Sequence, residues 1–361
     1  MRVWGMKSMT THQKRPANWV LLAGLALIGL LVAIGMRSCG GHPARIVYNP
    51  TPENEANLKR IVDGALTFTV LHEAGHMMVS ELNLLVLGHE EDAADGFAVF
   101  ILSDEDPKLP PNSENHTAQE EALAGGAIFF DGLYQQERLN KSETNWADEH
   151  GQPEQRAFTI TCLLVGMDPK RFADIAQASK LPPDRLERCP AEAANNRTNW
   201  INVLDPALER AKANSGGPAR IGVHYRPISP DLSEPLRSRL VRDRDRLMES
   251  HALSNVASIM SVVPLKPFSF MMRPQLNLND SDALARSARI QLHGPTEPGD
   301  EAFVETYEDY RVVGDPCLDK AGNPIANAFW NAEARTIFVC YALVELVEDI
   351  GKTDLAIATS K

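Results

Sequence analysis

The sequence predicts a mainly helical α+β fold preceded by one membrane-spanning helix. Three features lead to this prediction: an uncharged apolar run at 18–36, helical patterns with start signals over 51–204, and helices mixed with short strand-like runs over 218–352. The chain has 361 residues, of which 43% are hydrophobic and 23% are charged. That composition is typical of a globular protein that can bury a sizeable core.

The apolar run is long enough to cross a bilayer. Its sequence, "NWVLLAGLALIGLLVAIGM", contains no charged side chain, and roughly 18 such residues suffice for a membrane helix. More basic residues precede the run than follow it closely: Arg2, Lys7, Lys14 and Arg15 against Arg37 and Arg45. The positive-inside rule therefore leaves residues 1–17 in the cytoplasm and the rest of the chain on the extracytoplasmic, periplasmic side. We expect an uncleaved signal anchor, because "MRSCGG" is a poor cleavage site, with cleavage as the alternative.

The overall charge argues against one class of partner. The net charge is -12, whereas binding to nucleic acid needs a basic surface. The arginine-rich stretch at 237–246, "RSRLVRDRDR", alternates with aspartate, as a solvated helix face does. We therefore expect no nucleic-acid partner, and the sequence leaves the oligomeric state open.

Five cysteines fit an extracytoplasmic location. Cys162 and Cys189 lie in one segment, Cys317 and Cys340 lie in another, and Cys39 follows the apolar run. In an oxidising compartment these four residues are expected to form two disulfides, with one cysteine left over. Their connectivity stays open at this stage, and five unpaired thiols are the alternative.

The region from Thr51 predicts two helices joined by a turn. Thr51 is a suitable N-cap and Pro52 suits the first helical position. The first helix is expected to run to about Asn83, with Gly88 in the turn and a second helix over 90–102.

Helices continue downstream, and short strand-like runs appear near the C-terminus. Further helices are predicted over 117–140, 154–165, 169–179, 190–204, 233–250 and from 342 onward. Strand-like runs lie at 268–272, 288–292 and 335–341, and 211–220 is the linker candidate. The predicted organisation is a cytoplasmic tail (1–17), an anchor (18–36), a metal-binding core (44–212) and a C-terminal α+β part (218–352) that packs on the core.

The helix predicted from Thr51 carries a metal-binding pattern, "HEAGH". His72 and His76 are four residues apart and share one helix face, so both imidazoles can bind one Zn²⁺. Glu73 can act as general base toward a water on that metal. Gly75 costs stability in a helix interior, so we expect it to allow another backbone or a substrate to approach closely.

A third ligand is expected from the acidic stretch that follows. Glu91 is the first choice, and Asp95, four residues later, would orient a ligand histidine. Asp92, Asp95 and His89 are the alternative third ligands, and Glu90 and Asp92 are expected to point to solvent. The competing interpretation is an acidic first turn that is stabilised by the helix dipole and binds no metal.

These residues resemble a known arrangement. "HEAGH" followed by "EDAAD" is similar to the gluzincin pattern of zincin-type metallopeptidases, and "LHEAGHMMVSELNLLVLGHEEDAADGFA" (71–98) resembles the DUF4344 family of bacterial metallopeptidases. Segments 148–175 and 181–192 are similar to that family's downstream region. The resemblance implies a zincin-like, zinc-dependent hydrolase but no particular substrate.

One further block resembles the same family but stands in a different place. "GDPC" at 314 and "NAFWNAEARTIFVCYALVELV" (327–347) are similar to a block that precedes HExxH in the family, whereas here the block follows it. If the fold is kept, 314–350 must pack beside the helix from Thr51. "NAFW" could then supply an edge strand that binds a peptide, while a buried core strand is the expectation for "TIFVCY".

The remaining catalytic role is a donor that stabilises the developing oxyanion. His150 is the first choice, with Asp148 as its orienting partner, and Tyr134 and Arg156 are the alternatives. A surface histidine is the competing interpretation of His150. Lone histidines near strand-like runs, His224 and His293, are expected to be structural.

The sequence therefore predicts a membrane-anchored, extracytoplasmic zinc metallopeptidase that acts on a peptide or protein. His72, His76 and Glu91 would hold Zn²⁺, and Glu73 would activate water. Two alternatives are a zinc-stabilised envelope binding or scaffold protein without turnover, and a zinc amidase that acts on cell-wall material.

Overall fold

The computed structural model describes most of the chain after the predicted anchor. The described residues are 47–103, 114–140, 151–179, 181–215, 221–225, 228, 232–261, 263, 268–272, 317, 319 and 323–359. They belong to one compact unit, Val47–Lys361. The predicted anchor at 18–36 lies outside the described residues, and none of the described helices is both long and apolar enough to cross a membrane.

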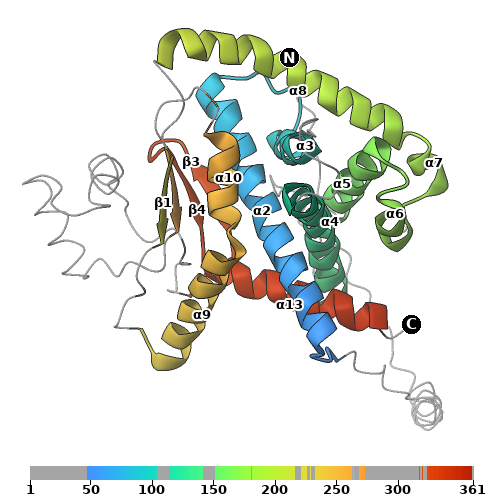
Figure 1. Cartoon of the computed structure of the whole chain (residues 1–361), viewed down its shortest axis with the longest axis vertical. Helices are drawn as coiled ribbons and strands as arrows, with labels where there is room; N and C mark the ends of the chain where they lie inside the picture. Colours follow the sequence, from blue (N-terminus) through green and yellow to red (C-terminus); the bar gives the residue numbers. More distant parts are fainter. Residues whose placement is uncertain are drawn as a thin grey trace, which may run out of the picture. The chain divides into compact units, whose positions relative to one another are not determined.

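A helix of 31 residues, α2 (Pro52–Leu82), carries both histidines and packs against many of the other elements. The side chain of Thr51 accepts the N–H of Asn54, so Thr51 is the N-cap, and Asn83 ends the helix in a left-handed conformation. These boundaries confirm the prediction from 51 to 83. In Figure 1, α2 (blue) passes between the sheet on one side and α3, α4 and α5 on the other.

Three helices cover one side of α2: α3 (Glu90–Ser103), α4 (Glu114–Asn140) and α5 (Pro153–Met167). The contact between α2 and α4 is close because both helices carry glycine there. A Cβ on Gly125 would lie 2.3 Å from the backbone nitrogen of Ala65. The small residues of "AGGAIFF" (124–130) thus serve helix packing.

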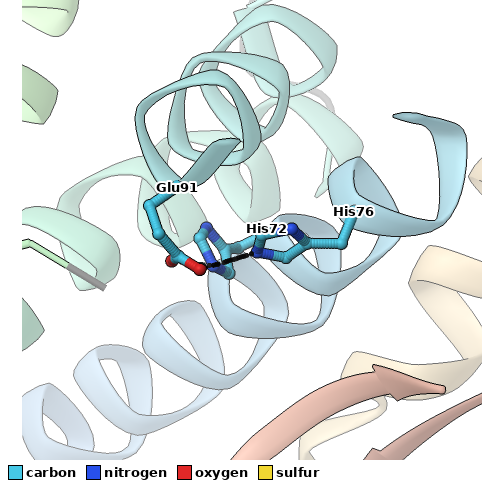
Figure 2. A group of neighbouring side chains, drawn as sticks. All are labelled: His72, His76 and Glu91. Atoms are coloured by element: carbon cyan, nitrogen blue, oxygen red, sulfur yellow. Dashed lines mark hydrogen bonds and ion pairs between the residues drawn. The ribbon is translucent and has the colours of Figure 1, made fainter. Parts of the chain in front are cut away.

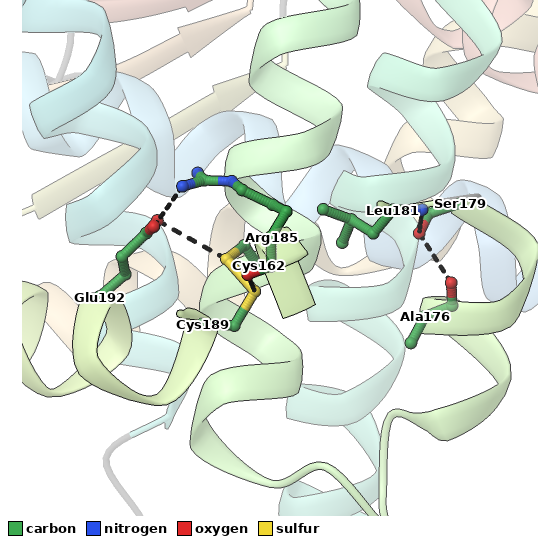
Figure 3. Close-up of a disulfide and its surroundings, with 7 residues drawn as sticks. All are labelled: Cys162, Ala176, Ser179, Leu181, Arg185, Cys189 and Glu192. Carbon is green, nitrogen blue, oxygen red and sulfur yellow. Dashed lines mark hydrogen bonds and ion pairs between the residues drawn. A yellow bond between two sulfur atoms is a disulfide. The ribbon is translucent and has the colours of Figure 1, made fainter. Parts of the chain in front are cut away.

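The next helices are α6 (Ala173–Ser179), α7 (Pro183–Leu186) and α8 (Cys189–Ser215). A disulfide between Cys162 and Cys189 joins α5 to α8, and Glu192 lies beside it (Figure 3). The end of α8 differs from the prediction, because the helix passes through Pro206 into the linker candidate at 211–220. Leu204 and Ala207, on either side of Pro206, are both buried, which holds the helix against its neighbours at this point.

A four-stranded sheet has the order β1–β2–β4–β3. Its strands are β1 (Ile221–Tyr225), β2 (Phe268–Met272), β3 (Ala328–Asn331) and β4 (Thr336–Val339). Strand β2 pairs in parallel with both β1 and β4, and β3 pairs antiparallel to β4. All four residues of β4 are buried, as expected for "TIFVCY". Strand β3 lies at one edge of the sheet, as expected for "NAFW". The strand-like run at 288–292 lies outside the described residues.

Three further helices complete the fold: α9 (Glu234–Ser250), α10 (Ala252–Met260) and α13 (Ala342–Thr359). Helix α13, β3 and β4 all pack on α2, so the block at 314–350 lies beside the helix from Thr51, as expected. A second disulfide joins Cys317 to Cys340. The prediction of two disulfides among these four cysteines is confirmed, as is a mainly helical α+β fold with a few short strands.

Candidate metal centre

The two histidines of α2 face the same point. Their Nε2 atoms lie 3.2 Å apart and their rings meet edge to face with centroids 4.8 Å apart. Figure 2 shows both rings directed at the carboxylate of Glu91 from α3. The i, i+4 spacing on a single helix produces this convergence.

Glu91 completes a set of three donors. One of its carboxylate oxygens lies 3.2 Å from Nε2 of His72, and the other lies 3.2 Å from Nε2 of His76. The three residues are the group that the described part of the chain offers for a metal, with one donor atom from each within 4.8 Å of the others. The alternatives His89 and Asp92 are exposed.

Close helix packing brings Glu91 to the histidines. A Cβ on Gly75 would lie 2.9 Å from Cα of Ala94 and 3.2 Å from its Cβ. Any side chain at Gly75 would therefore push α3, and Glu91 with it, away from α2. The expected close approach at Gly75 is that of another backbone, the backbone of α3.

The donor set fits zinc. Bonds of about 2.0–2.1 Å in tetrahedral geometry place neighbouring ligand atoms roughly 3.3 Å apart. The two Nε2 atoms lie 3.2 Å apart, and each lies 3.2 Å from a different oxygen of Glu91. Two imidazole nitrogens and one carboxylate oxygen are also the donor types that zinc prefers in catalytic sites, where a fourth position stays open.

Each histidine is oriented by a second carboxylate. Nδ1 of His72 lies 2.8 Å from Oδ1 of Asp95, and Nδ1 of His76 lies 2.8 Å from Oε1 of Glu90. Such partners fix which ring nitrogen faces the metal. Asp95 lies where the sequence placed it. Glu90 is exposed, as expected, but its position directly before Glu91, in the first turn of α3, also allows it to reach the second histidine.

Arg156 of α5 lies behind this first layer. Its Nε and Nη2 donate to the two oxygens of Asp95 at 2.9 and 2.8 Å, and Nη1 lies 3.6 Å from Glu91. The guanidinium also lies 4.0 Å from the centroid of the Phe130 ring. Arg156 is 8% exposed, and two of its nitrogens hold Asp95. Its alternative role as an oxyanion donor stays a prediction.

Glu73 points to the centre from the other side. It is 7% exposed, and its Oε1 lies 4.0 Å from Nε2 of His72. Its Oε2 accepts the backbone N–H of Trp330 at 2.9 Å. Burial raises the pKa of Glu73, although the two histidines and the Trp330 N–H oppose that rise.

The charges of the cluster set its protonation. Burial alone would lower the pKa of His72, but the charge of Asp95 and hydrogen bonds to Asp95 and Glu91 raise it to about 9. Burial would likewise raise the pKa of Glu91, but hydrogen bonds from both imidazoles hold it far below its ordinary value. The carboxylates around the two histidines therefore favour the protonated imidazoles in the metal-free protein.

Zinc affinity is expected to rise with pH between 6 and 9. Ligation requires neutral imidazole, and each displaced proton raises the apparent affinity about tenfold per pH unit below the histidine pKa, which is about 9 for His72. The stability of the metal-free protein is expected to fall, not rise, over the same pH range. The raised pKa of His72 contributes fully to stability below the ordinary histidine value of about 6.5, and this contribution is lost as the pH rises toward 9. Chelator competition and urea unfolding at pH 6, 7, 8 and 9 measure both trends, and an affinity that does not change with pH would contradict this expectation.

The other sequence candidates lie elsewhere. His150, Asp148 and His293 lie outside the described residues, so the first choice of oxyanion donor stays a prediction. Tyr134 forms a hydrogen bond with Glu154 that contributes to raising the pKa of Tyr134. His224 lies on β1, at the far side of the sheet order from β3.

The comparisons with known proteins agree with this site. Residues 44–204 match the family model DUF4344, whose description is "Putative metallopeptidase". The matched region contains both histidines, Glu73, Glu91, Asp95 and Arg156, and it ends before the block at 314–350. No curated protein and no solved structure matches the chain.

Proposed function

Because residues 44–204 match the DUF4344 family model, we propose that the protein is a zinc-dependent metallopeptidase that hydrolyses peptide bonds. One observation carries this proposal: one donor atom from each of three residues lies within 4.8 Å of the others, and the carboxylate of Glu73 lies 4.0 Å from Nε2 of His72. A site that only stabilised the fold would have no use for this buried carboxylate.

Zinc held by His72, His76 and Glu91 would act as a Lewis acid toward the scissile carbonyl and lower the pKa of the attacking water. Glu73 takes the proton of that water and passes it to the leaving amine. A carboxylate whose pKa is raised by burial suits both steps, because it must accept a proton and then release it. Asp95 and Glu90 keep the two Nε2 atoms directed inward throughout.

The strand β3 offers a place for the peptide. It is one of the two edge strands of the described sheet and packs against α2. An extended peptide can pair with such an edge, with main-chain hydrogen bonds that do not depend on the peptide's sequence. We therefore place the substrate between β3 and the metal centre.

The proposed location is the extracytoplasmic face of a membrane. The apolar run at 18–36 with its preceding basic residues supports an anchor. The two disulfides support an oxidising compartment.

Replacing Glu73 with glutamine tests the proposed function. In zinc-loaded full-length protein, peptide cleavage is expected to fall about 10²- to 10⁴-fold because the base is lost, while zinc stoichiometry stays at the wild-type level. The measurement is cleavage of a mixed peptide library with and without chelator. The matched control is Glu53→Gln, an exposed glutamate at the start of the same helix. Equal cleavage by Glu73→Gln and wild type would refute the mechanism, and zinc binding without any peptide cleavage would favour a binding protein or an amidase.

A further inference from the structure

The contact between Glu73 and the edge strand supports an inference that rests on the proposed function and deepens it. We propose that the backbone N–H of Trp330 is the positioning group for Glu73, and that this amide is not among those offered to a substrate. The observation is the 2.9 Å hydrogen bond from Trp330 N to Glu73 Oε2.

The pairing of β3 with β4 directs this amide outward. Residues opposite each other in an antiparallel pair alternate between those that exchange hydrogen bonds and those that do not. Cys340 N donates to Asn327 O at 2.9 Å, and Trp330 lies opposite Ile337, three pairs further along. Trp330 therefore belongs to a pair without ladder hydrogen bonds, and its N–H points away from β4 toward α2.

The two oxygens of Glu73 consequently have different roles. Oε2 is held by the Trp330 amide, whereas Oε1 faces the metal centre, 4.0 Å from Nε2 of His72. A carboxylate fixed through one oxygen cannot rotate freely, so the other oxygen keeps one orientation toward the attacking water. Positioning of this kind is worth a large factor in rate, since a misplacement of about 1 Å costs roughly 100-fold.

The strand itself is fixed to α2 at a second point. Arg335, in the turn between β3 and β4, forms an ion pair with Glu81, which lies eight residues after Glu73 on the same helix. Arg335 has φ 46°, a left-handed conformation that the tight turn requires. The hairpin is thus held along α2 at both Glu73 and Glu81, and the Trp330 amide cannot drift from its acceptor.

This assignment limits how a peptide can use the edge. With the Trp330 N–H engaged by Glu73, a peptide at this edge would have to pair with other groups of β3, such as the amide of Ala328, which by the same alternation also points away from β4. Glu73 and the peptide therefore occupy adjacent positions on one strand, which places the scissile bond next to the base.

The first test reads the hydrogen bond without any activity. Full-length protein is labelled with ¹⁵N at the backbone amides of its five tryptophans, and the Trp330→Phe variant identifies the Trp330 signal by its loss. In Glu73→Ala, the Trp330 amide proton is expected to shift upfield and to exchange at least about tenfold faster. The control Glu53→Ala is expected to change neither. An unchanged Trp330 signal in Glu73→Ala overturns the proposal.

The second test is kinetic and uses zinc-loaded full-length variants. Trp330→Pro removes the amide and is expected to lower kcat about 10- to 100-fold, with KM within about threefold and zinc stoichiometry retained. Trp330→Phe keeps the amide, so its kcat should fall less than that of Trp330→Pro. Ala328→Pro should raise KM instead of lowering kcat. A kcat for Trp330→Pro equal to that of Trp330→Phe overturns the proposal. If the wild type cleaves no peptide, or if Trp330→Pro does not fold, the proposed function is judged separately and the spectroscopic test decides alone.

Discussion

Replacing Glu91 with alanine is expected to abolish stoichiometric zinc binding. The variant removes the acidic ligand that lies 3.2 Å from both imidazoles, and two histidines alone do not make a closed set of protein ligands for zinc. The loss of affinity should exceed the roughly 10- to 100-fold that follows from removing an outer partner of a ligand. Metal analysis after dialysis and chelator competition give the stoichiometry and the affinity.

Asp92→Ala is the matched control for this experiment. Asp92 is the next residue in the same helical turn, but its side chain is exposed, so zinc stoichiometry should stay at the wild-type level. If Glu91→Ala retained stoichiometric zinc in a folded protein, the third ligand would have to be another group.

Replacing Arg156 with methionine is expected to destabilise the metal-free protein by about 3–5 kcal/mol, because it leaves a buried carboxylate without its cation. The carboxylate is that of Asp95, which is 1% exposed and receives two hydrogen bonds from Arg156. Zinc affinity should also fall about 10- to 100-fold, since Asp95 orients His72. Urea unfolding and chelator competition measure the two effects.

Two further variants test whether the loss of stability in Arg156→Met comes from its pairing with Asp95. Arg197 lies over the Phe100 ring much as Arg156 lies over Phe130, but Arg197 is exposed. Arg197→Met should therefore cost no more than about 1 kcal/mol. Adding Asp95→Asn to Arg156→Met should recover part of the lost stability, because the unpaired charge is removed. If the losses of stability from Arg156→Met and Asp95→Asn simply added in the double variant, Arg156 would act only through packing.

The sequence predicts well that the two histidines and Glu91 lie together, because their signals are local. His72 and His76 belong to one helix whose start at Thr51 and end at Asn83 are marked by capping residues. Glu91 lies in the first turn of the next helix, and a short turn between two helices leaves few ways to pack them. Spacing on a helix face was therefore sufficient to place all three donors.

The outer groups of the site could not be placed in this way. Arg156 is 61 residues from Asp95, and Trp330 is 257 residues from Glu73. Such pairings depend on how whole elements pack, and a backbone amide has no signature in a sequence. The strand β1 escaped prediction for a related reason, since a run of five residues takes its stability from its neighbour β2.

The distance in sequence between Glu73 and Trp330 separates two stages in the making of this site. Every proposed ligand and Arg156 lie within the first 156 residues, whereas the amide that holds Glu73 is at residue 330. A chain that is still being synthesised, or one that is truncated after α8, could therefore gather a metal ion before it could orient its base. We expect metal loading and catalytic competence to be acquired in that order, because the β3–β4 hairpin follows all the proposed ligands in the chain.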